Sequence, residues 1–186
     1  DLLAYNYSGW YSTLEVRDGG QASLVGSTIV SQSSYGKLAV RDGGQLDLTN
    51  VTIQDSSSGL RATYYAGSAG TISGTTGNWD LYLYSDSPLV TGGTEVDHVN
   101  VSGSSTIDDT TINRLDYDDG SATIQSSTIG YIDYSAGAAT LTGNTLTDGV
   151  TGIRLVDDID TTVEACHFSN NSISISLSNA ESMRIR

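Results

Sequence analysis

Short apolar clusters recur along the whole chain and are separated by Gly, Ser, Asn and Asp. Within a cluster, apolar and polar residues alternate, as in Leu14-Glu15-Val16 and Leu38-Ala39-Val40. No segment keeps its apolar residues at helical spacing over ten or more positions. Alternation with a period of two is typical of β-strands that bury one face. The pattern therefore predicts many short strands joined by tight turns.

The clusters form a repeat. Residues 14–21 (LEVRDGGQ) recur as residues 38–45 (LAVRDGGQ), and Thr111-Ile112 recurs as Thr128-Ile129. One register joins both halves when each unit is anchored at an apolar pair of the form L-x-V. The predicted anchors are Leu14/Val16, Leu38/Val40, Leu60/Ala62, Leu81/Leu83, Val99/Val101, Leu115/Tyr117, Ile132/Tyr134, Ile153/Leu155 and Ile175/Leu177. Successive anchors are 16 to 24 residues apart. Constant strands with connections of variable length are expected of a solenoid, because stacked strands must superpose and turns need not.

Equivalent strands of such units stack in parallel. The sequence therefore predicts an all-β fold, a right-handed parallel β-helix solenoid of about nine coils, formed by residues 1–186 as a single domain. No polar capping helix is evident beside the first or the last anchor. We therefore expect the domain to be a segment of a larger repeat protein, or to associate through its ends with a partner or another copy.

Units such as residues 40–53 (VRDGGQLDLTNVTI) and 126–129 (SSTI) resemble the coils of the pectate-lyase-like right-handed β-helix superfamily. They look most like its surface-protein and adhesin branch, and the resemblance covers nearly the whole chain. It implies a set of functions: polysaccharide lyases, hydrolases, epimerases, phage tailspikes and non-catalytic surface domains. The fold alone does not choose among them.

Charge narrows the list of partners. The 186 residues include 22 acidic and 8 basic ones, a net charge of −14, which excludes nucleic acid as a partner and disfavours anionic membrane surfaces. No apolar run is long enough to insert into a membrane. The single cysteine, Cys166, excludes an internal disulfide and a cysteine-based zinc site. A well-solvated acidic surface suits an extracellular or cell-surface location.

If the anchors point inward, the residues beside them form an exposed face. Were the protein an enzyme, the catalytic candidates on this face would be His98, Arg114, Asp116, Asp133 and Arg154. Asp116 and Asp133 would lie on neighbouring coils about 5 Å apart, which suits a carboxylate pair acting on a glycosidic bond. The carbohydrate-binding candidates are Tyr82, Tyr84, Tyr131 and Asn100, where the tyrosines would stack on sugar rings. The plainer interpretation is a solvated surface on which arginines neutralise aspartates in register.

Other patterns give weaker signals. Asp157, Asp158 and Asp160 are calcium candidates, although solvated turn carboxylates explain them better. An outward column of threonines makes ice binding a further hypothesis. Its members are Thr28, Thr52, Thr111, Thr128 and Thr145. Trp10 and Trp79 are either core residues or sugar platforms.

These patterns favour an extracellular or cell-surface structural or adhesive module with no catalytic activity and no cofactor. The alternative is a domain that binds or cleaves polysaccharide, and ice binding ranks third. The expected partners are a polysaccharide, a cell-surface component or another copy of the chain.

Overall fold

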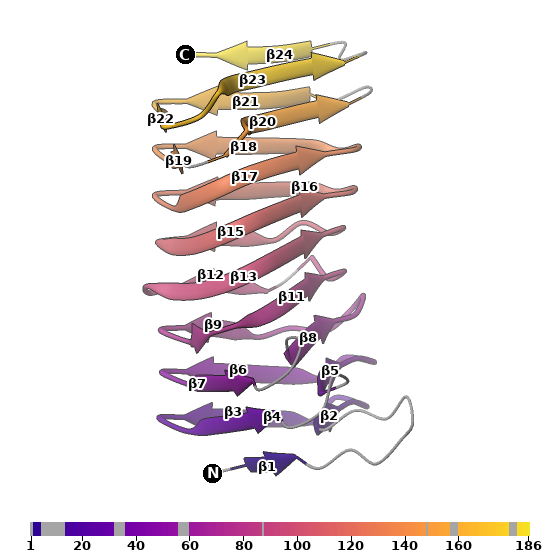
Figure 1. Cartoon of the computed structure of the whole chain (residues 1–186). Helices are drawn as coiled ribbons and strands as arrows, with labels where there is room; N and C mark the ends of the chain where they lie inside the picture. Colours follow the sequence, from indigo (N-terminus) through magenta and orange to yellow (C-terminus); the bar gives the residue numbers. More distant parts are fainter. Residues whose placement is uncertain are drawn as a thin grey trace.

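The computed structural model describes residues 2–4, 14–31, 36–55, 60–86, 88–147, 149–156, 160–178 and 182–186. Over these ranges every regular element is a β-strand, with no helix. The strands stack into a parallel β-solenoid, which confirms the predicted fold class (Figure 1). The right-handed sense of the coil stays a prediction.

Three parallel sheets form the sides of the solenoid. The long sheet has 11 strands: β2 (Leu14–Val16), β5 (Lys37–Val40), β8 (Leu60–Tyr64), β11 (Trp79–Leu83), β13 (Thr94–Val101), β15 (Thr110–Tyr117), β17 (Thr128–Tyr134), β19 (Thr145–Thr147) and β22 (His167–Ser169), with β20 (Thr151–Val156) and β23 (Ile173–Ser178) branching from β17. The back sheet has 9 strands: β3 (Gln21–Val25), β6 (Gln45–Thr49), β9 (Thr71–Ser73), β12 (Leu89–Thr91), β14 (Thr106–Asp108), β16 (Ser121–Gln125), β18 (Ala138–Thr142), β21 (Asp160–Glu164) and β24 (Ser182–Ile185). The short sheet has 4 strands: β1 (Leu2–Ala4), β4 (Thr28–Ser31), β7 (Thr52–Asp55) and β10 (Thr76–Gly77).

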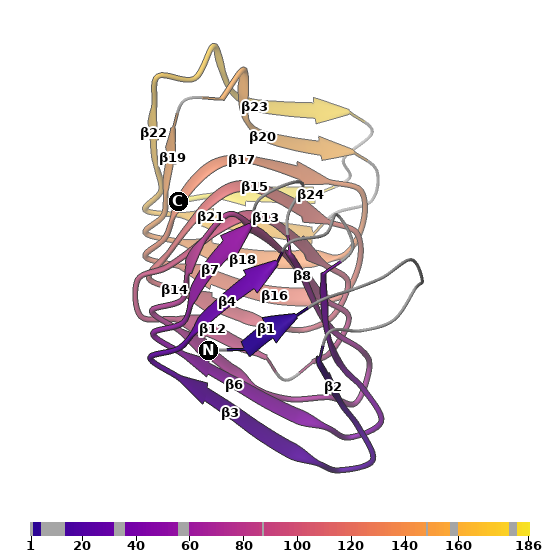
Figure 2. The ribbon, with the colours of Figure 1, turned by 60° about the horizontal axis from the view of Figure 1, so that its bottom comes forward.

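The long and back sheets face each other, and the short sheet forms part of a third side (Figures 1 and 2). Above the short sheet, the first residues of β13, β15 and β17 continue this third side, and the same strands then bend into the long sheet. The bend in β13 lies at Asp97, between the paired segments 94–96 and 98–101. The middle of the solenoid therefore has continuous strands where its ends have separate ones.

Most of the predicted anchors stack in register. The column that starts at Leu14 contains the first member of every predicted anchor except the third, where Ala62 takes the place of Leu60: Leu14, Leu38, Ala62, Leu81, Val99, Leu115, Ile132, Ile153 and Ile175. The predicted third anchor, Leu60/Ala62, is wrong, because Leu38 pairs with Ala62 and Val40 pairs with Tyr64. Strand β8 points Leu60, Ala62 and Tyr64 all inward. Alternation alone cannot choose between registers that differ by two residues.

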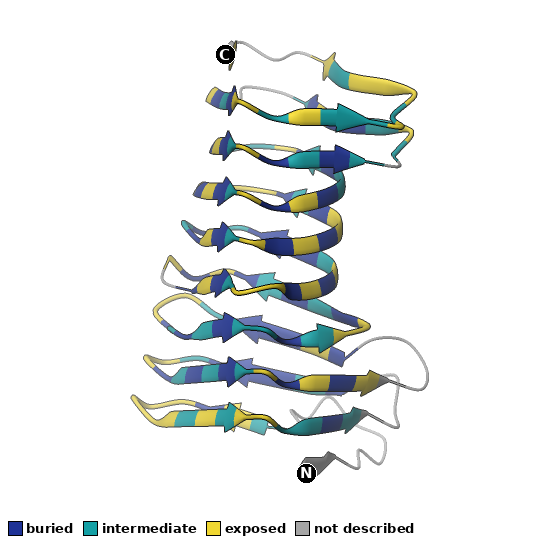
Figure 3. Cartoon of the chain, turned by 90° about the vertical axis from the view of Figure 1, so that its left-hand side faces the viewer, coloured by how far each residue is buried: buried dark blue, intermediate teal, exposed yellow. Residues whose placement is uncertain are grey.

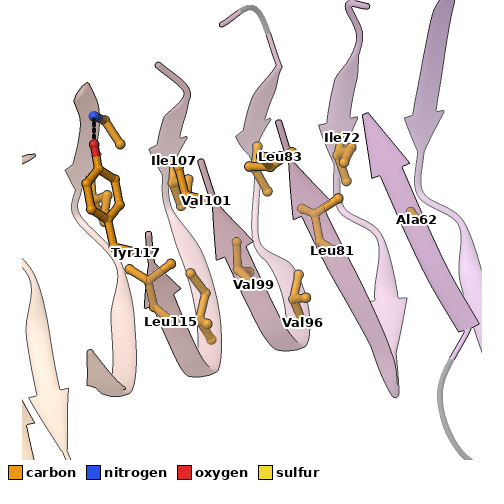
Figure 4. Close-up of a cluster of buried hydrophobic side chains, with 14 of the residues drawn as sticks. Ala62, Ile72, Leu81, Leu83, Val96, Val99, Val101, Ile107, Leu115 and Tyr117 are labelled. Carbon is orange, nitrogen blue, oxygen red and sulfur yellow. Dashed lines mark hydrogen bonds between the residues drawn. The ribbon is translucent and has the colours of Figure 1, made fainter. Parts of the chain in front are cut away.

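The core lies between the sheets. Figure 3 shows buried and less buried residues alternating along the strands, and Figure 4 shows Leu81, Val99 and Leu115 projecting toward Ile72 and Ile107 of the back sheet. Among the buried aromatic residues, the Tyr64 hydroxyl donates to Leu46 O at 2.9 Å. The apolar side chains packed between the two sheets supply the main stabilising contribution to a solenoid.

The solenoid has about six turns with a closed, buried interior rather than the predicted nine coils. Apolar residues near both ends of the solenoid are partly exposed in the part of the chain that the structure describes. At one end Ile173, Leu177 and Ile185 are 49%, 57% and 64% exposed, and at the other Leu14 and Leu24 are only partly buried. Association through the ends stays a prediction.

Two kinds of turn set the repeat. In residues 17–20 and 41–44 both central residues, Asp-Gly, have positive φ, which a type I′ turn requires. The corner between the back sheet and the third side uses one left-handed residue in most rungs and two, Gly92 and Gly93, in the rung between β12 and β13. That residue is often glycine, but its φ lies between 48° and 52° at Asn50, Asp109, Ser126 and Ala165. This single-residue corner explains why inward residues such as Ile124 and Ile129 are five positions apart.

Candidate functional site

The outer face of the long sheet carries three columns of side chains. The first column contains Lys37, Arg61, Asp80, His98, Arg114 and Tyr131. The second contains Glu15, Ala39, Thr63, Tyr82, Asn100, Asp116, Asp133, Arg154 and Ser176. The third follows the ends of the strands and contains Arg41, Tyr65, Tyr84, Ser102, Asp118 and Ser135. The predicted candidates therefore lie on one surface.

Aromatic rings form a continuous row across β8, β11 and β13. The ring centroids of Tyr65 and Tyr84 are 6.2 Å apart, and those of Tyr84 and Tyr82 are 6.1 Å apart. The His98 ring meets the Tyr82 ring edge-on at 5.8 Å. Tyr65 and Tyr82 are half-buried and Tyr84 is 38% exposed, and partial burial raises the pKa of Tyr82 and Tyr84. We call Tyr65, Tyr84 and Tyr82 the tyrosine row.

Tyr65 is the functional candidate that the sequence prediction missed. The shifted third anchor placed Gly59, Arg61 and Thr63 on the exposed face, whereas the observed register places Arg61, Thr63 and Tyr65 there. The spacing of the turn glycines indicates the correct register of β8. Gly67 has a φ of 77° and lies 24 residues after Gly43, whose φ is 76°.

Cations lie against these rings. The Arg61 guanidinium is 4.3 Å from the Tyr82 ring centroid. Lys37 and Arg41 lie 5.0 Å and 5.4 Å from the Tyr65 ring centroid, and Lys37 Nζ also donates to the Tyr65 hydroxyl. Cation–π contacts of this kind hold the rings and the cations in fixed relative positions.

Asp116 is the centre of the polar part of the face. Its Oδ2 is 3.0 Å from His98 Nε2, and its Oδ1 accepts from Arg114 Nε at 2.7 Å. The side chain of Asp116 is 16% exposed, whereas that of Arg114 is 46% exposed. The hydrogen bond to Asp116 raises the pKa of Arg114. The carboxylate thus orients an imidazole and a guanidinium side by side.

Asp133 is the register partner of Asp116 on the next strand, as predicted. Each carboxylate, however, has its own cation: Asp133 Oδ2 lies 3.5 Å from Arg154 Nη1, and Asp133 and Arg154 are also register partners. Arg154 therefore neutralises Asp133 across strands, as the plainer interpretation expects, whereas Arg114 pairs with Asp116 within β15.

Two further candidates differ in their surroundings. Asn100 is 8% exposed and its amide donates to Asp118 Oδ2 at 2.7 Å, so its N–H group is already engaged. Tyr131 lies apart from the tyrosine row, with its ring centroid 5.7 Å from the Arg114 guanidinium carbon.

A depression of about 470 Å³ lies where β13 and β15 bend into the long sheet. It is lined by Asp80, Asp97, His98, Asn113, Arg114 and Tyr131. A second depression of about 340 Å³, lined in part by Asp97 and Asn113, adjoins it on the third side. The surface beside the tyrosine row is therefore hollowed rather than flat.

The remaining candidates fall elsewhere. Asp160 is exposed at the start of β21, and Asp157 and Asp158 lie outside the described residues, as does Trp10. Trp79 is fully buried and donates to Glu95 O at 2.8 Å, which makes it a core residue. Within the described ranges, no group of three or more His, Cys, Asp or Glu side chains is placed to hold a metal ion. In the same part of the chain, no helix is long and apolar enough to cross a membrane.

The predicted threonine column is interrupted on the third side. Thr28, Thr52 and Thr76 are register partners, but Glu95 occupies the next rung before Thr111. Ice binding stays a prediction on this face.

Comparison of the chain with protein-family models, with curated proteins and with solved structures finds no match. The structure itself supports a parallel β-solenoid, and kinship with the pectate-lyase-like superfamily stays an inference from the residues.

Proposed function

We propose that the chain is a non-catalytic, extracellular or cell-surface adhesive module that holds a polysaccharide on the outer face of its long sheet. On this proposal the coil is right-handed, and the chain is akin to the surface-protein branch of β-helices. The observation that carries the proposal is the tyrosine row, in which the Tyr84 ring contacts both the Tyr65 ring and the Tyr82 ring, and all three remain partly open to solvent.

Aromatic rings of this kind offer sugars an apolar surface together with a polar rim. Tyr65 and Tyr84 come from successive rungs, where parallel strands are about 4.8 Å apart, and Tyr82 lies on the same rung as Tyr84. A polysaccharide that lies along the solenoid axis would therefore cross both rungs and meet a tyrosine ring on each. Arg61 and Asp116 beside the rings supply donors and acceptors for sugar hydroxyl groups.

Two features favour binding over cleavage. Asp116 is hydrogen-bonded to Arg114 and contacts His98, and Asp133 is paired with Arg154. Each carboxylate is therefore engaged by a cation of its own, whereas in a glycosidase both carboxyl groups act on the glycosidic bond.

The test is a glycan-array screen followed by calorimetry on the strongest ligand. Tyr84→Ala is expected to weaken binding by about 1–2 kcal/mol, roughly tenfold, because a stacked ring is lost. Tyr84→Phe keeps the ring and removes only the hydroxyl, so it serves as the matched control and should bind within about threefold of the wild type. Equal affinity of Tyr84→Ala and the wild type for every glycan that binds would contradict the proposal.

Cleavage is the second candidate, favoured by the position of His98 within hydrogen-bonding distance of Asp116 at the edge of the 470 Å³ depression. A carboxylate that orients an imidazole is a recurring arrangement for proton transfer. Turnover of any bound glycan that disappears in Asp116→Asn, with the tyrosine row intact, would replace the adhesive proposal with this one.

A further inference from the structure

Two cations on the outer face lie directly opposite each other. Lys37 on β5 and Arg61 on β8 are register partners in neighbouring parallel strands. Like charges placed opposite each other across strands destabilise a sheet. The pairing is more notable in a protein with 22 acidic and only 8 basic residues. On its other side Arg61 faces Asp80 of β11, so Arg61 lies at the boundary between the basic and the acidic parts of the outer face.

A second pair of neighbouring cations on the face, Arg17 and Arg41, shares one carboxylate. Arg17 and Arg41 share Glu15, whose Oε1 lies 3.8 Å from Arg17 Nη1 and 3.1 Å from Arg41 Nε. Arg61, in contrast, forms no ion pair within 4.0 Å with any residue that the structure describes. It is exposed and rests on the face of the Tyr82 ring. A guanidinium has five N–H donors, and a contact with a ring face does not use them as an ion pair would, so they remain available to an oxyanion.

The tyrosine row links the two cations. Lys37 contacts the Tyr65 ring, Tyr65 contacts Tyr84, Tyr84 contacts Tyr82, and Tyr82 carries Arg61. A sugar ring on these tyrosines would thus lie beside both positive charges.

We propose that Lys37 and Arg61 bind an oxyanion substituent, a carboxylate or a sulfate, of the polysaccharide that lies on the tyrosine row. This inference rests on the proposed function and specifies its ligand as an anionic polymer. It also gives the ligand a position. Beyond Arg61 the face carries Asp80, Asp116, Asp118 and Asp133, which repel an anion, so the charged sugar units lie over β5 and β8.

The experiment compares three polymers that share one backbone: dextran, carboxymethyl dextran and dextran sulfate of equal chain length. Binding is measured by calorimetry for the wild type, Arg61→Gln and Lys37→Gln. Arg154→Gln is the matched control, because Arg154 is an arginine of the same sheet whose side chain is 59% exposed and which is paired with Asp133. In parallel, inorganic sulfate is titrated while the arginine Nε–Hε resonances are followed by NMR.

The wild type is expected to bind at least one of the two anionic polymers at least about tenfold more tightly than dextran, since a charge-assisted hydrogen bond contributes that much. Arg61→Gln and Lys37→Gln should each lose about tenfold, and Arg154→Gln should stay within about twofold of the wild type. The relative affinities of carboxymethyl dextran and dextran sulfate identify the anionic group.

Failure of the two proposals can be told apart. Dextran binding that requires Tyr84, with no gain from charged substituents, would overturn the anion site and leave the glycan-binding function standing. A sulfate-induced shift of the Arg61 resonance without binding of any polymer would support the anion site and remove the glycan function. Equal losses in Arg61→Gln and Arg154→Gln, or no response to sulfate or to either anionic polymer, would overturn the inference.

Discussion

The interior of the solenoid makes a sharp prediction at Leu115. This side chain is fully buried, is flanked in its column by Val99 and Ile132, and projects into the cluster shown in Figure 4. Replacing a buried leucine by alanine removes apolar contacts and leaves a cavity, which costs about 2–5 kcal/mol of unfolding free energy. Because neighbouring rungs hold the walls of the site in place, we expect Leu115→Ala to fall in the upper half of that range.

Leu89 is the matched control. It carries the same side chain but lies on the outer surface of the back sheet, where it is 37% exposed and sits between Thr71 and Thr106 in its column. Leu89→Ala leaves no closed cavity, so its cost should be about 1 kcal/mol or less. Urea unfolding followed by circular dichroism measures both variants against the wild type. Equal losses at Leu115 and Leu89 would refute the assignment of inner and outer faces.

Three further predictions concern single groups. Ala165→Gly should raise the unfolding free energy by up to about 1 kcal/mol in the same urea assay, because the φ of Ala165 is 52° and glycine adopts this conformation without strain; a loss of stability would contradict it. Tyr64→Phe should lower stability by about 1–2 kcal/mol, since Leu46 O would lose its buried donor. Tyr134→Phe should change stability little, because the buried Tyr134 hydroxyl makes no hydrogen bond of normal geometry. A larger loss in Tyr134→Phe than in Tyr64→Phe, measured by urea unfolding, would contradict this prediction. Burial raises the pKa of Tyr117 from 10.0 to about 12, so its contribution to stability is complete below about pH 10 and is lost as the pH rises to about 12; urea midpoints across this range should fall less steeply in Tyr117→Phe, and an unchanged slope would count against it.

The sequence could predict which face of the sheet each candidate residue lies on, because side chains alternate along a strand, but it could not predict their contacts. Alternation placed His98, Asp116 and Tyr82 on the outer face, and the register pairs confirm that they share it. The contacts among them depend on rotamers and on cross-strand distance, which no sequence pattern encodes. The ring contacts of the tyrosine row and the separate cations of Asp116 and Asp133 therefore emerged only from the structure.

The sequence by itself determined the parallel solenoid. The alternation of apolar and polar residues within each strand and the turn residues between strands are local properties that repeat along the chain. It determined eight of the anchors for the same reason. It misplaced the third, since a slip of two residues in β8 buries the same face and differs only in whether Tyr64 fills the interior. Only the tertiary structure decided that register, and with it the position of Tyr65 beside Lys37 and the number of closed turns. These features depend on which residues of neighbouring rungs fit together in space.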